Sequence, residues 1–327
     1  MKLCTVCHRA FADAETRCPD DGETLAPDPL VGTSLGPFAV TGWLAEGGLG
    51  ILYRGEHTGI HRPVAIKLLK PALMGDEAAR RRFFTEAQVV AKLAHPHLID
   101  IFDLGTAPDG RVYYVMELLQ GRTLAARMAE APLPFAEVVP IVRDVCEALA
   151  VAHAIGLVHR DLKPANLFLV ERAGEAPFVK VLDFGIAKVL GGDASGAEQL
   201  TRTGHLLGTP QYMAPEQIDG GAVDVRADVY ALGVIVYELA TGTLPFAAQT
   251  VGGLLKAHLV EAPPRFDAAR LAPGVPPALE AIAWKALRKV PDERYDSVRA
   301  LADDLGRAAR GEPTAADAWW RLELADG

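Results

Sequence analysis

The stretch HRDLKPAN, residues 159–166, decides the fold when it is read together with five other signals along the chain. Taken alone, Asp161 reads as a turn aspartate, and Lys67 reads as a surface lysine at a strand end. The other signals are the glycine-rich LAEGGLGILYRG at 44–55, VAIK at 64–67, Glu86, DFG at 183–185 and APE at 214–216. Six signals in one order and at suitable spacing are very improbable by chance, so they are interpreted together.

The pattern of apolar residues changes from strand-like to helical along the chain. FAVTGWLA, ILYRGEH and PVAIKLLK predict three strands from Phe38 onward, and LIDIFDLG and VYYVMELL predict two more. A helix is predicted over 76–93, with Asp76 as its N-cap. Beyond Gly121 the helices are predicted near 136–155, 224–241, 276–288 and 297–309. The fold class is therefore α+β, with a small β-rich lobe before a larger α-rich lobe.

In this order the six signals resemble the protein kinase superfamily over about residues 38–309. The likeness is closest to the bacterial, eukaryotic-type Ser/Thr kinases, on EGGLG and GTPQYMAPEQ. The resemblance implies a bilobal fold, with an N-lobe over about 38–118 and a C-lobe over about 120–309. It also implies transfer of the ATP γ-phosphate to serine and threonine hydroxyls of protein substrates.

Glycine-rich turns let the backbone approach phosphate oxygens and present N–H donors to them. The resemblance implies that Lys67 holds the α- and β-phosphates of ATP and pairs with Glu86 on the following helix. The chain departs from the family pattern at the first loop glycine, where Ala45 stands, while Gly47 and Gly50 remain. We expect this extra methyl group to be a mild change.

The resemblance assigns the chemical step to residues of HRDLKPAN and DFG. Asp161 is expected to orient the substrate hydroxyl and accept its proton, and Lys163 to reach the γ-phosphate. Asn166 and Asp183 supply the oxygen ligands that Mg²⁺ or Mn²⁺ requires. A phosphoryl group in transfer spreads negative charge over its oxygens, and such residues supply fixed cations and donors there.

The adenine pocket follows from the same resemblance. Phe168, which replaces the more usual leucine, is expected beneath the base, and Met116 behind it as gatekeeper; generic core packing is the alternative for these apolar residues. The remaining nucleotide-binding residues expected are Leu44, Ala45, Glu46, Gly47, Gly48, Gly50, Leu52, Ala65, Glu117 and Leu119.

Arg160 precedes Asp161 directly, as in kinases whose activation segment is ordered by a phosphate. Thr201 and Thr203 are the predicted phosphorylation sites, with Ser195 third, because an arginine can bind a phosphothreonine bidentately. Three structural roles are also expected: Thr209 contacts Asp161, Glu216 pairs with Arg294, and Asp228 braces the catalytic loop.

Residues 1–25 form a separate candidate unit. CTVCH at 4–8 has the spacing of a haem attachment site, a redox pair or half a zinc knuckle. RCPDDG at 17–22 resembles the second turn of a zinc ribbon, and Asp21 stands where the fourth cysteine would fall. We therefore expect a structural zinc site of Cys4, Cys7, Cys18 and Asp21, with a metal-free ribbon remnant as the alternative.

The remaining segments are a linker predicted at 26–37 and a C-terminal tail at 310–327. Trp319 and Trp320 of the tail are expected to dock on the large lobe, with docking on a partner as the alternative. A net charge of -9 gives no reason to expect nucleic-acid binding. No apolar stretch is long enough to span a bilayer, no signal peptide opens the chain, and a cytoplasmic location is expected. The rival interpretation is a pseudokinase scaffold that acts through a partner bound at the zinc-ribbon-like segment. The intact set Lys67, Asp161, Asn166 and Asp183 disfavours it.

Overall fold

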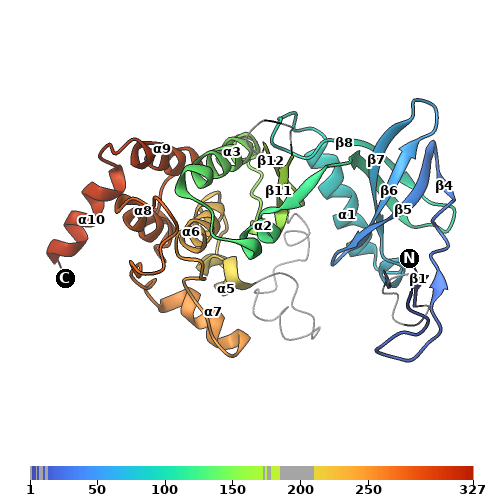
Figure 1. Cartoon of the computed structure of the whole chain (residues 1–327), viewed down its shortest axis with the longest axis horizontal. Coiled ribbons are helices and arrows are strands. Elements are labelled where there is room, and N and C mark those ends of the chain that lie inside the picture. Colours follow the sequence, from blue (N-terminus) through green and yellow to red (C-terminus); the bar gives the residue numbers. More distant parts are fainter. Residues whose placement is uncertain are drawn as a thin grey trace. The chain divides into compact units, whose positions relative to one another are not determined.

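The computed structural model describes residues 2–4, 6, 10–11, 14–171, 174, 178–184 and 210–326. The chain divides into two compact units (Figure 1). The first comprises Met1–Ala94 and Ile99–Leu119, and the second comprises His95–Leu98 and Gln120–Gly327. The first is rich in strands and the second in helices, as the sequence predicted.

The first unit is built on a six-stranded antiparallel sheet with the strand order β4-β5-β6-β7-β9-β8. The five predicted strands are all present in it. The bounds are β4 Ser34–Leu35, β5 Phe38–Glu46, β6 Gly50–His57, β7 Arg62–Leu69, β8 Ile101–Thr106 and β9 Val112–Glu117.

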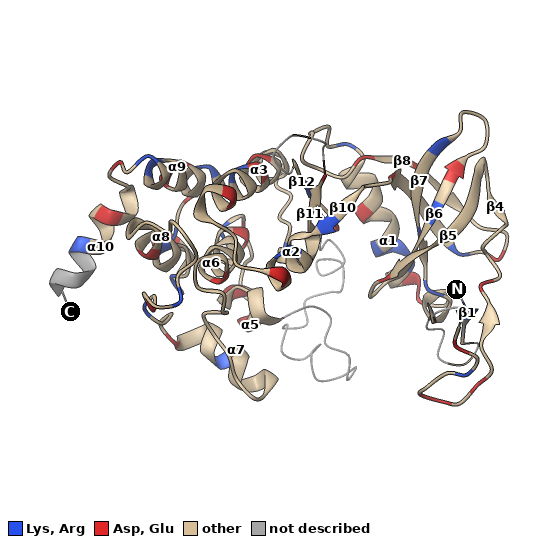
Figure 2. Ribbon diagram, viewed as in Figure 1, with Lys and Arg blue, Asp and Glu red and all other residues tan. Residues whose placement is uncertain are grey.

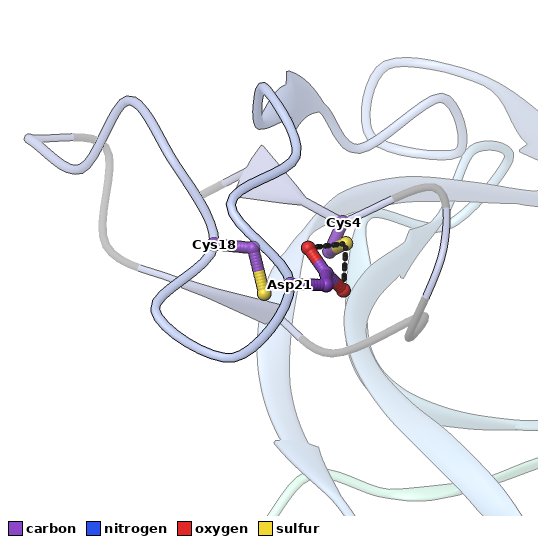
Figure 3. Close-up of side chains that lie close together, drawn as sticks. All are labelled: Cys4, Cys18 and Asp21. Atoms are coloured by element: carbon purple, nitrogen blue, oxygen red, sulfur yellow. Dashed lines mark hydrogen bonds between the residues drawn. The ribbon is translucent and has the colours of Figure 1, made fainter.

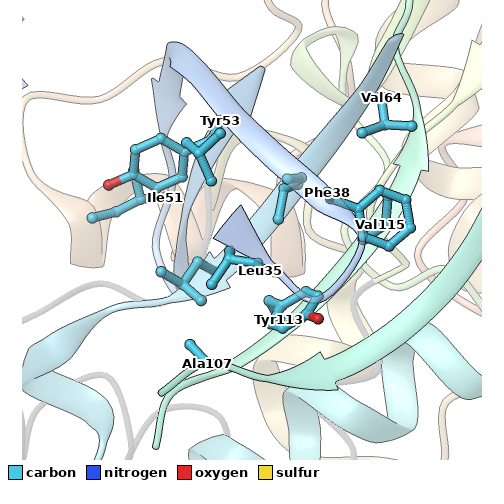
Figure 4. Packing of buried hydrophobic residues seen from close by; sticks show 11 residues of the cluster. Leu35, Phe38, Ile51, Tyr53, Val64, Ala107, Tyr113 and Val115 are labelled. Carbon is cyan, nitrogen blue, oxygen red and sulfur yellow. The ribbon is translucent and has the colours of Figure 1, made fainter. Parts of the chain in front are cut away.

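Side-chain alternation along β7 separates a core face from a site face. Val64, Ile66 and Leu68 are at most 1% exposed and belong to one hydrophobic cluster, which Figure 4 shows. Ala65 and Lys67 point to the other face, because successive residues of a strand alternate in direction. In VAIK, Val64 and Ile66 therefore pack into the hydrophobic core, and Lys67 lies on the opposite face of the sheet.

Helix α1 (Glu77–Val90) is positioned by its cap and by one buried stripe. The side chain of Asp76 accepts a hydrogen bond from Ala79 N at 3.0 Å, which confirms the predicted N-cap. The buried residues recur at helical spacing: Ala79, Phe83, Glu86, Ala87 and Val90. The stripe packs against β8 and β9, where Phe83 meets the ring of Tyr114 at 4.9 Å.

The segment 26–37, predicted as a linker, is part of the first unit. β1 (Lys2–Leu3), β2 (Ala10–Phe11) and β3 (Ala26–Pro27) form a small sheet. Leu35 of β4 is 1% exposed within the core cluster, and Leu30 packs against it. The sequence prediction missed this attachment because the segment is rich in turn residues and carries only two leucines as anchors.

The second unit is mainly helical. The four predicted helices are α3 Phe135–Ala154, α6 Arg226–Thr241, α8 Ala278–Ala286 and α9 Val298–Ala309. The sequence prediction did not place α2 Leu124–Glu130, α5 Pro215–Asp219, α7 Val251–Val260 or α10 Ala315–Asp326. A small sheet of β10 Gly121–Thr123, β11 Leu167–Val170 and β12 Phe178–Val181 completes the unit, with single 3-10 turns at Pro164–Asn166, Pro210–Tyr212 and Pro291–Glu293.

Helix α6 lies at the centre of the second unit. Nearly all of its side chains are buried, as predicted for this apolar stretch. A Cβ atom at Gly233 would lie 2.7 Å from Ala286 Cβ, so glycine is needed for the close contact with α8. Cys146 of α3 is 1% exposed and packs as a small buried residue.

Helix α10 occupies part of the predicted C-terminal tail and packs against α8. Asp304 of α9 accepts hydrogen bonds from the backbone N–H groups of Ala315 and Ala316 at 2.8 and 2.9 Å. The ring of Trp320 meets Trp284 edge-on at 5.0 Å. The expected docking on the large lobe is therefore present for Trp320.

Charged side chains are interspersed over both units rather than gathered by sign (Figure 2). Helix α1 carries three consecutive arginines. A guanidinium nitrogen of Arg80 lies 3.6 Å from the Glu77 carboxylate and one of Arg82 lies 3.8 Å from the Asp76 carboxylate, while Arg81 is exposed. Among the described residues, no helix combines the length and the apolar character that crossing a bilayer requires.

Candidate active site

The glycine-rich turn joins β5 to β6 in the first unit. Gly47 N donates to Gly50 O at 2.9 Å, which closes the turn. A Cβ atom at Gly50 would lie 2.9 Å from Leu68 O and 3.2 Å from Lys67 Cγ, whereas one at Gly48 would meet nothing within 4 Å. Gly50 is thus required for packing against β7 beside Lys67, and Gly48 lies at the open tip.

Lys67 and Glu86 form the expected ion pair, with Lys67 Nζ 3.7 Å from Glu86 Oε1. The two side chains are 13% and 9% exposed, so each charge needs the other. β7 supplies the lysine and the buried stripe of α1 supplies the glutamate. The ammonium group also lies over the ring of Tyr114, 5.5 Å from its centre.

Four of the residues expected around the adenine lie on four strands of the first unit. Ala45 pairs with Leu52 across β5 and β6, and Ala65 pairs with Met116 across β7 and β9. Ala65 and Met116 are 4% and 8% exposed. The N–H of Glu117 donates to Asp100 O at 3.0 Å, so it is engaged within the unit.

Three other residues expected at the nucleotide site, Leu44, Leu119 and Phe168, are less buried than Ala65 and Met116. Leu44 and Leu119 are half-buried in the first unit. Phe168 belongs to the second unit, where it is half-buried on β11 and pairs with Lys180 of β12.

In the second unit, three expected catalytic side chains converge. Lys163 Nζ lies 2.9 Å from Asp161 Oδ2. Asn166 Nδ2 donates to Asp161 O at 2.8 Å and lies 3.4 Å from Asp161 Oδ2. Because the amide nitrogen of Asn166 binds the loop backbone, its oxygen is oriented away from that contact and suits a metal ligand.

Asp228 at the start of α6 holds the backbone that precedes Asp161. Its Oδ2 accepts from His159 N at 2.8 Å and its Oδ1 accepts from Arg160 N at 3.0 Å. His153 Nε2 lies 2.7 Å from Asp228 Oδ2. Arg160 has φ 64°, a left-handed conformation that costs energy for a non-glycine residue, and these bonds stabilise it. The predicted bracing role of Asp228 is confirmed.

Asp183 is fixed by the residues on either side of it. Leu182 N donates to Asn166 O at 2.8 Å, which joins the DFG stretch to the catalytic loop. Phe184 is fully buried and its ring lies 4.7 Å from that of His159. Burial lowers the pKa of His159, whose Nε2 lies 3.0 Å from Leu182 O. Asp183 itself has φ 36°, again in the left-handed region.

Glu216 and Arg294 form the predicted buried ion pair, with bonds of 2.8 and 2.7 Å between guanidinium and carboxylate. The side chain of Arg294 is 0% exposed and that of Glu216 is 9% exposed. The pair joins α5 to the residues that follow α8. Its charge-assisted bonds are of the stronger kind.

Arg160 has a half-buried side chain, and burial lowers its pKa. Within the described residues no acidic side chain lies within ion-pair distance of its guanidinium group. Thr201, Thr203, Ser195 and Thr209 lie outside the described residues.

Cys4, Cys18 and Asp21 lie together in the N-terminal segment, with one ligand atom from each within 4.8 Å of the others. Figure 3 shows the carboxylate of Asp21 facing Cys4 Sγ, at 3.2 and 3.5 Å. Two zinc ligands at Zn–S 2.3 Å and Zn–O 2.1 Å in a tetrahedron are separated by about 3.6 Å. The spacing of sulfur and oxygen is therefore close to that of a zinc site. Cys7 lies outside the described residues.

The sequence prediction missed one buried polar pair near the catalytic loop. Tyr212 O–H donates to Glu238 Oε2 at 2.7 Å, and burial raises the pKa of Glu238. Glu238 is a carboxylate within the apolar stretch 229–241 of α6, and a carboxylate that is partly buried requires a partner. That requirement was a usable signal, although it did not identify Tyr212.

Comparison with known proteins gives consistent matches. The family described as "Protein kinase domain" matches residues 38–304. The chain is 45% identical over 297 residues to serine/threonine-protein kinase Pkn1 of Myxococcus xanthus, covering 91% of this chain and 41% of the relative. It is 38% identical over 276 residues to serine/threonine-protein kinase PknD of Mycobacterium tuberculosis, covering 84% and 40%.

Among solved structures, the PknI kinase domain of Mycobacterium tuberculosis matches with a TM-score of 0.65 and 32% identity, covering 86% of this chain and 98% of that one. The chain spans less than half the length of Pkn1 and PknD. The similarity thus extends over nearly all of this chain but over only part of those relatives.

Proposed function

The chain belongs to the protein kinase family, and we propose that it transfers the γ-phosphate of ATP to serine and threonine hydroxyls of protein substrates. The observation that carries the proposal is the catalytic loop, where Asp161, Lys163 and Asn166 meet within hydrogen-bond distance. The serine/threonine class follows the printed names of the relatives and the lysine at position 163.

Each site residue has a role that its setting supports. Asp161 orients the acceptor hydroxyl and takes its proton, while Lys163 balances charge next to it. Lys67, held by Glu86, binds the α- and β-phosphates. Asn166 and Asp183 fit Mg²⁺ or Mn²⁺ because both offer oxygen ligands; the bound cation neutralises phosphate charge.

The adenine pocket is proposed from the family resemblance and from the apolar surfaces of Ala65 and Met116. These two side chains face the same way across β7 and β9 because directly paired residues of adjacent strands share a face. Phe168 is proposed as a nucleotide-binding residue on the family resemblance alone.

Activation by phosphate on the segment after Asp183 is part of the proposal. Its support is Arg160, whose half-buried guanidinium forms no ion pair with a described carboxylate, although the charge of Asp228 acts on it through space. A phosphothreonine at Thr201 or Thr203 would supply the missing anion and accept bidentate hydrogen bonds.

The test is intact mass after incubation with ATP and Mg²⁺, following treatment with a phosphatase that is then removed. We expect the wild type to gain phosphate at Thr201 or Thr203 and Asp161→Asn to gain none. Asp296→Asn is the matched control, because this exposed aspartate has no described partner and the charge change is equal. A wild type that binds ATP but gains no phosphate would support the pseudokinase scaffold instead.

We also propose that the N-terminal segment binds structural zinc through Cys4, Cys18 and Asp21, with Cys7 as the fourth ligand. The support is the chemistry of the donor set and the sulfur–oxygen spacing near 3.5 Å. Val6 N donates to Cys4 Sγ at 3.4 Å, as expected for a sulfur that carries negative charge.

Metal analysis tests this site. We expect one zinc ion per chain in the wild type and a loss of zinc in Cys18→Ser and Asp21→Asn. Cys146→Ala removes the buried thiol of α3 and should keep the full zinc content. Zinc retained by Cys18→Ser at the wild-type level would contradict the proposed ligand set.

A further inference from the structure

We propose that Lys70 is a positioning residue for the glycine-rich turn and acts through Glu46. The inference rests on the proposed use of ATP, because the turn is assigned to the phosphates. Lys70 follows directly after β7, three residues beyond Lys67, and Glu46 is the last residue of β5. Neither the family resemblance nor the comparisons give Lys70 a role.

Lys70 holds the turn at two points. Its Nζ lies 2.7 Å from Glu46 Oε1, with side-chain exposures of 26% and 20%. Its backbone N–H donates to Leu49 O at 3.0 Å. One contact is at the start of the turn and the other is near its end. The turn from 46 to 50 is therefore fastened across its base to the strand that carries Lys67.

The charge of Glu46 makes the contact important for an anionic ligand. A carboxylate within a phosphate-binding turn repels phosphate oxygens unless a cation neutralises it. Without Lys70, we expect the Glu46 side chain to lose its fixed place and the turn to lose its preferred position.

Affinity measurements test the proposal directly. Binding of ATP with Mg²⁺ and of adenosine is measured by calorimetry for the wild type, Lys70→Ala, Lys70→Arg, Glu46→Gln and the exchanged pair Glu46→Lys with Lys70→Glu. Lys92→Ala is the matched control, because Lys92 is an exposed lysine of the same unit without a described partner. Thermal melting verifies that each variant is folded.

We expect Lys70→Ala to weaken ATP binding about fivefold, the equivalent of a coupling near 1 kcal/mol for a partly buried pair. Adenosine affinity should not change, because the turn contacts phosphates only. Lys70→Arg and the exchanged pair should restore most of the ATP affinity, and Lys92→Ala should match the wild type. A general loss of stability would instead weaken adenosine binding as well.

Glu46→Gln separates positioning from simple charge. If Lys70 acted only as a positive charge near the phosphates, removal of the acidic Glu46 would strengthen ATP binding. Positioning through the pair predicts weaker binding. Stronger ATP binding by Glu46→Gln, or unchanged binding by Lys70→Ala, would overturn the inference. A wild type that transfers no phosphate would refute the proposed function. The ATP affinities of the Lys70 and Glu46 variants would still show whether Lys70 positions the turn.

Discussion

Replacing Glu216 by glutamine tests how strongly the buried pair with Arg294 supports the second unit. The guanidinium group has five N–H donors, and all five are used. They bind both oxygens of Glu216 and the carbonyl oxygens of Arg288, Arg226 and Lys289, over distances of 2.7 to 3.0 Å. The glutamine leaves a buried, uncompensated positive charge and turns an amide N–H₂ group toward guanidinium donors.

The expected loss in the free energy of unfolding is about 3 kcal/mol, the lower end for breaking a buried ion pair from one side. For a unit of this size that corresponds to a fall in melting temperature of roughly 6–12 °C. The assay is urea denaturation followed by tryptophan fluorescence. Three of the four tryptophans, at 284, 319 and 320, belong to the second unit, so the signal reports mainly on it.

Glu312→Gln is the matched control. Arg310 Nε and Nη2 bind both oxygens of Glu312 at 2.8 Å, so the geometry is equally bidentate, but the side chains are 60% and 48% exposed. We expect no measurable change in the urea midpoint, because water screens an exposed pair. If Glu216→Gln were as stable as this control, burial would not be the source of the stabilisation.

Three further outcomes are expected. Gly50→Ala should weaken ATP binding, because the new Cβ would lie 2.9 Å from Leu68 O of the adjacent strand. Gly48→Ala should bind ATP like the wild type, because its Cβ would meet nothing within 4 Å. Equal losses of ATP affinity for both variants in calorimetry would contradict this. Burial lowers the pKa of His258 to about 4, so the unfolded state binds more protons between that value and the ordinary 6.5. Stability should therefore fall as pH drops from 6.5 towards 4, and His258→Gln should reduce the slope of urea midpoint against pH. Trp320→Ala should lower stability by about 1 kcal/mol through loss of the edge-on contact with Trp284, measured by thermal melting; an unchanged melting temperature would show that α10 does not stabilise the unit.

The sequence predicted those parts of the fold that local patterns determine. Alternation along VAIK and the helical spacing around Glu86 predicted the strand and the helix, whereas the pairing of Lys67 with Glu86, now seen at 3.7 Å, was implied by the family resemblance. Asp76 was found because an aspartate before a helical pattern is an N-cap signal. Glu216 and Arg294 were paired from the family resemblance across 78 positions.

The missed features depend on tertiary contacts that no local pattern encodes. Leu30 and Leu35 look like residues of a turn-rich connection, and only the sheet provides their hydrophobic partners. The link between Tyr212 and Glu238 joins a 3-10 turn to a buried helix 26 positions away. Lys70 reads as one more basic residue at a strand end until Glu46 is placed beside it.

The short strand β4 shows that the folded unit extends to residues before the start of the family match. The family match starts at Phe38, yet Ser34 and Leu35 pair with β5 from the outer side. A chain trimmed to the matched residues would leave Val40 N without its acceptor, Thr33 O. It would also expose apolar side chains at the β5 edge of the sheet to solvent. Uncovered strands of that kind recruit other chains and aggregate. Residues 28–37 thus cover the β5 edge of the sheet, and we expect their removal to promote aggregation.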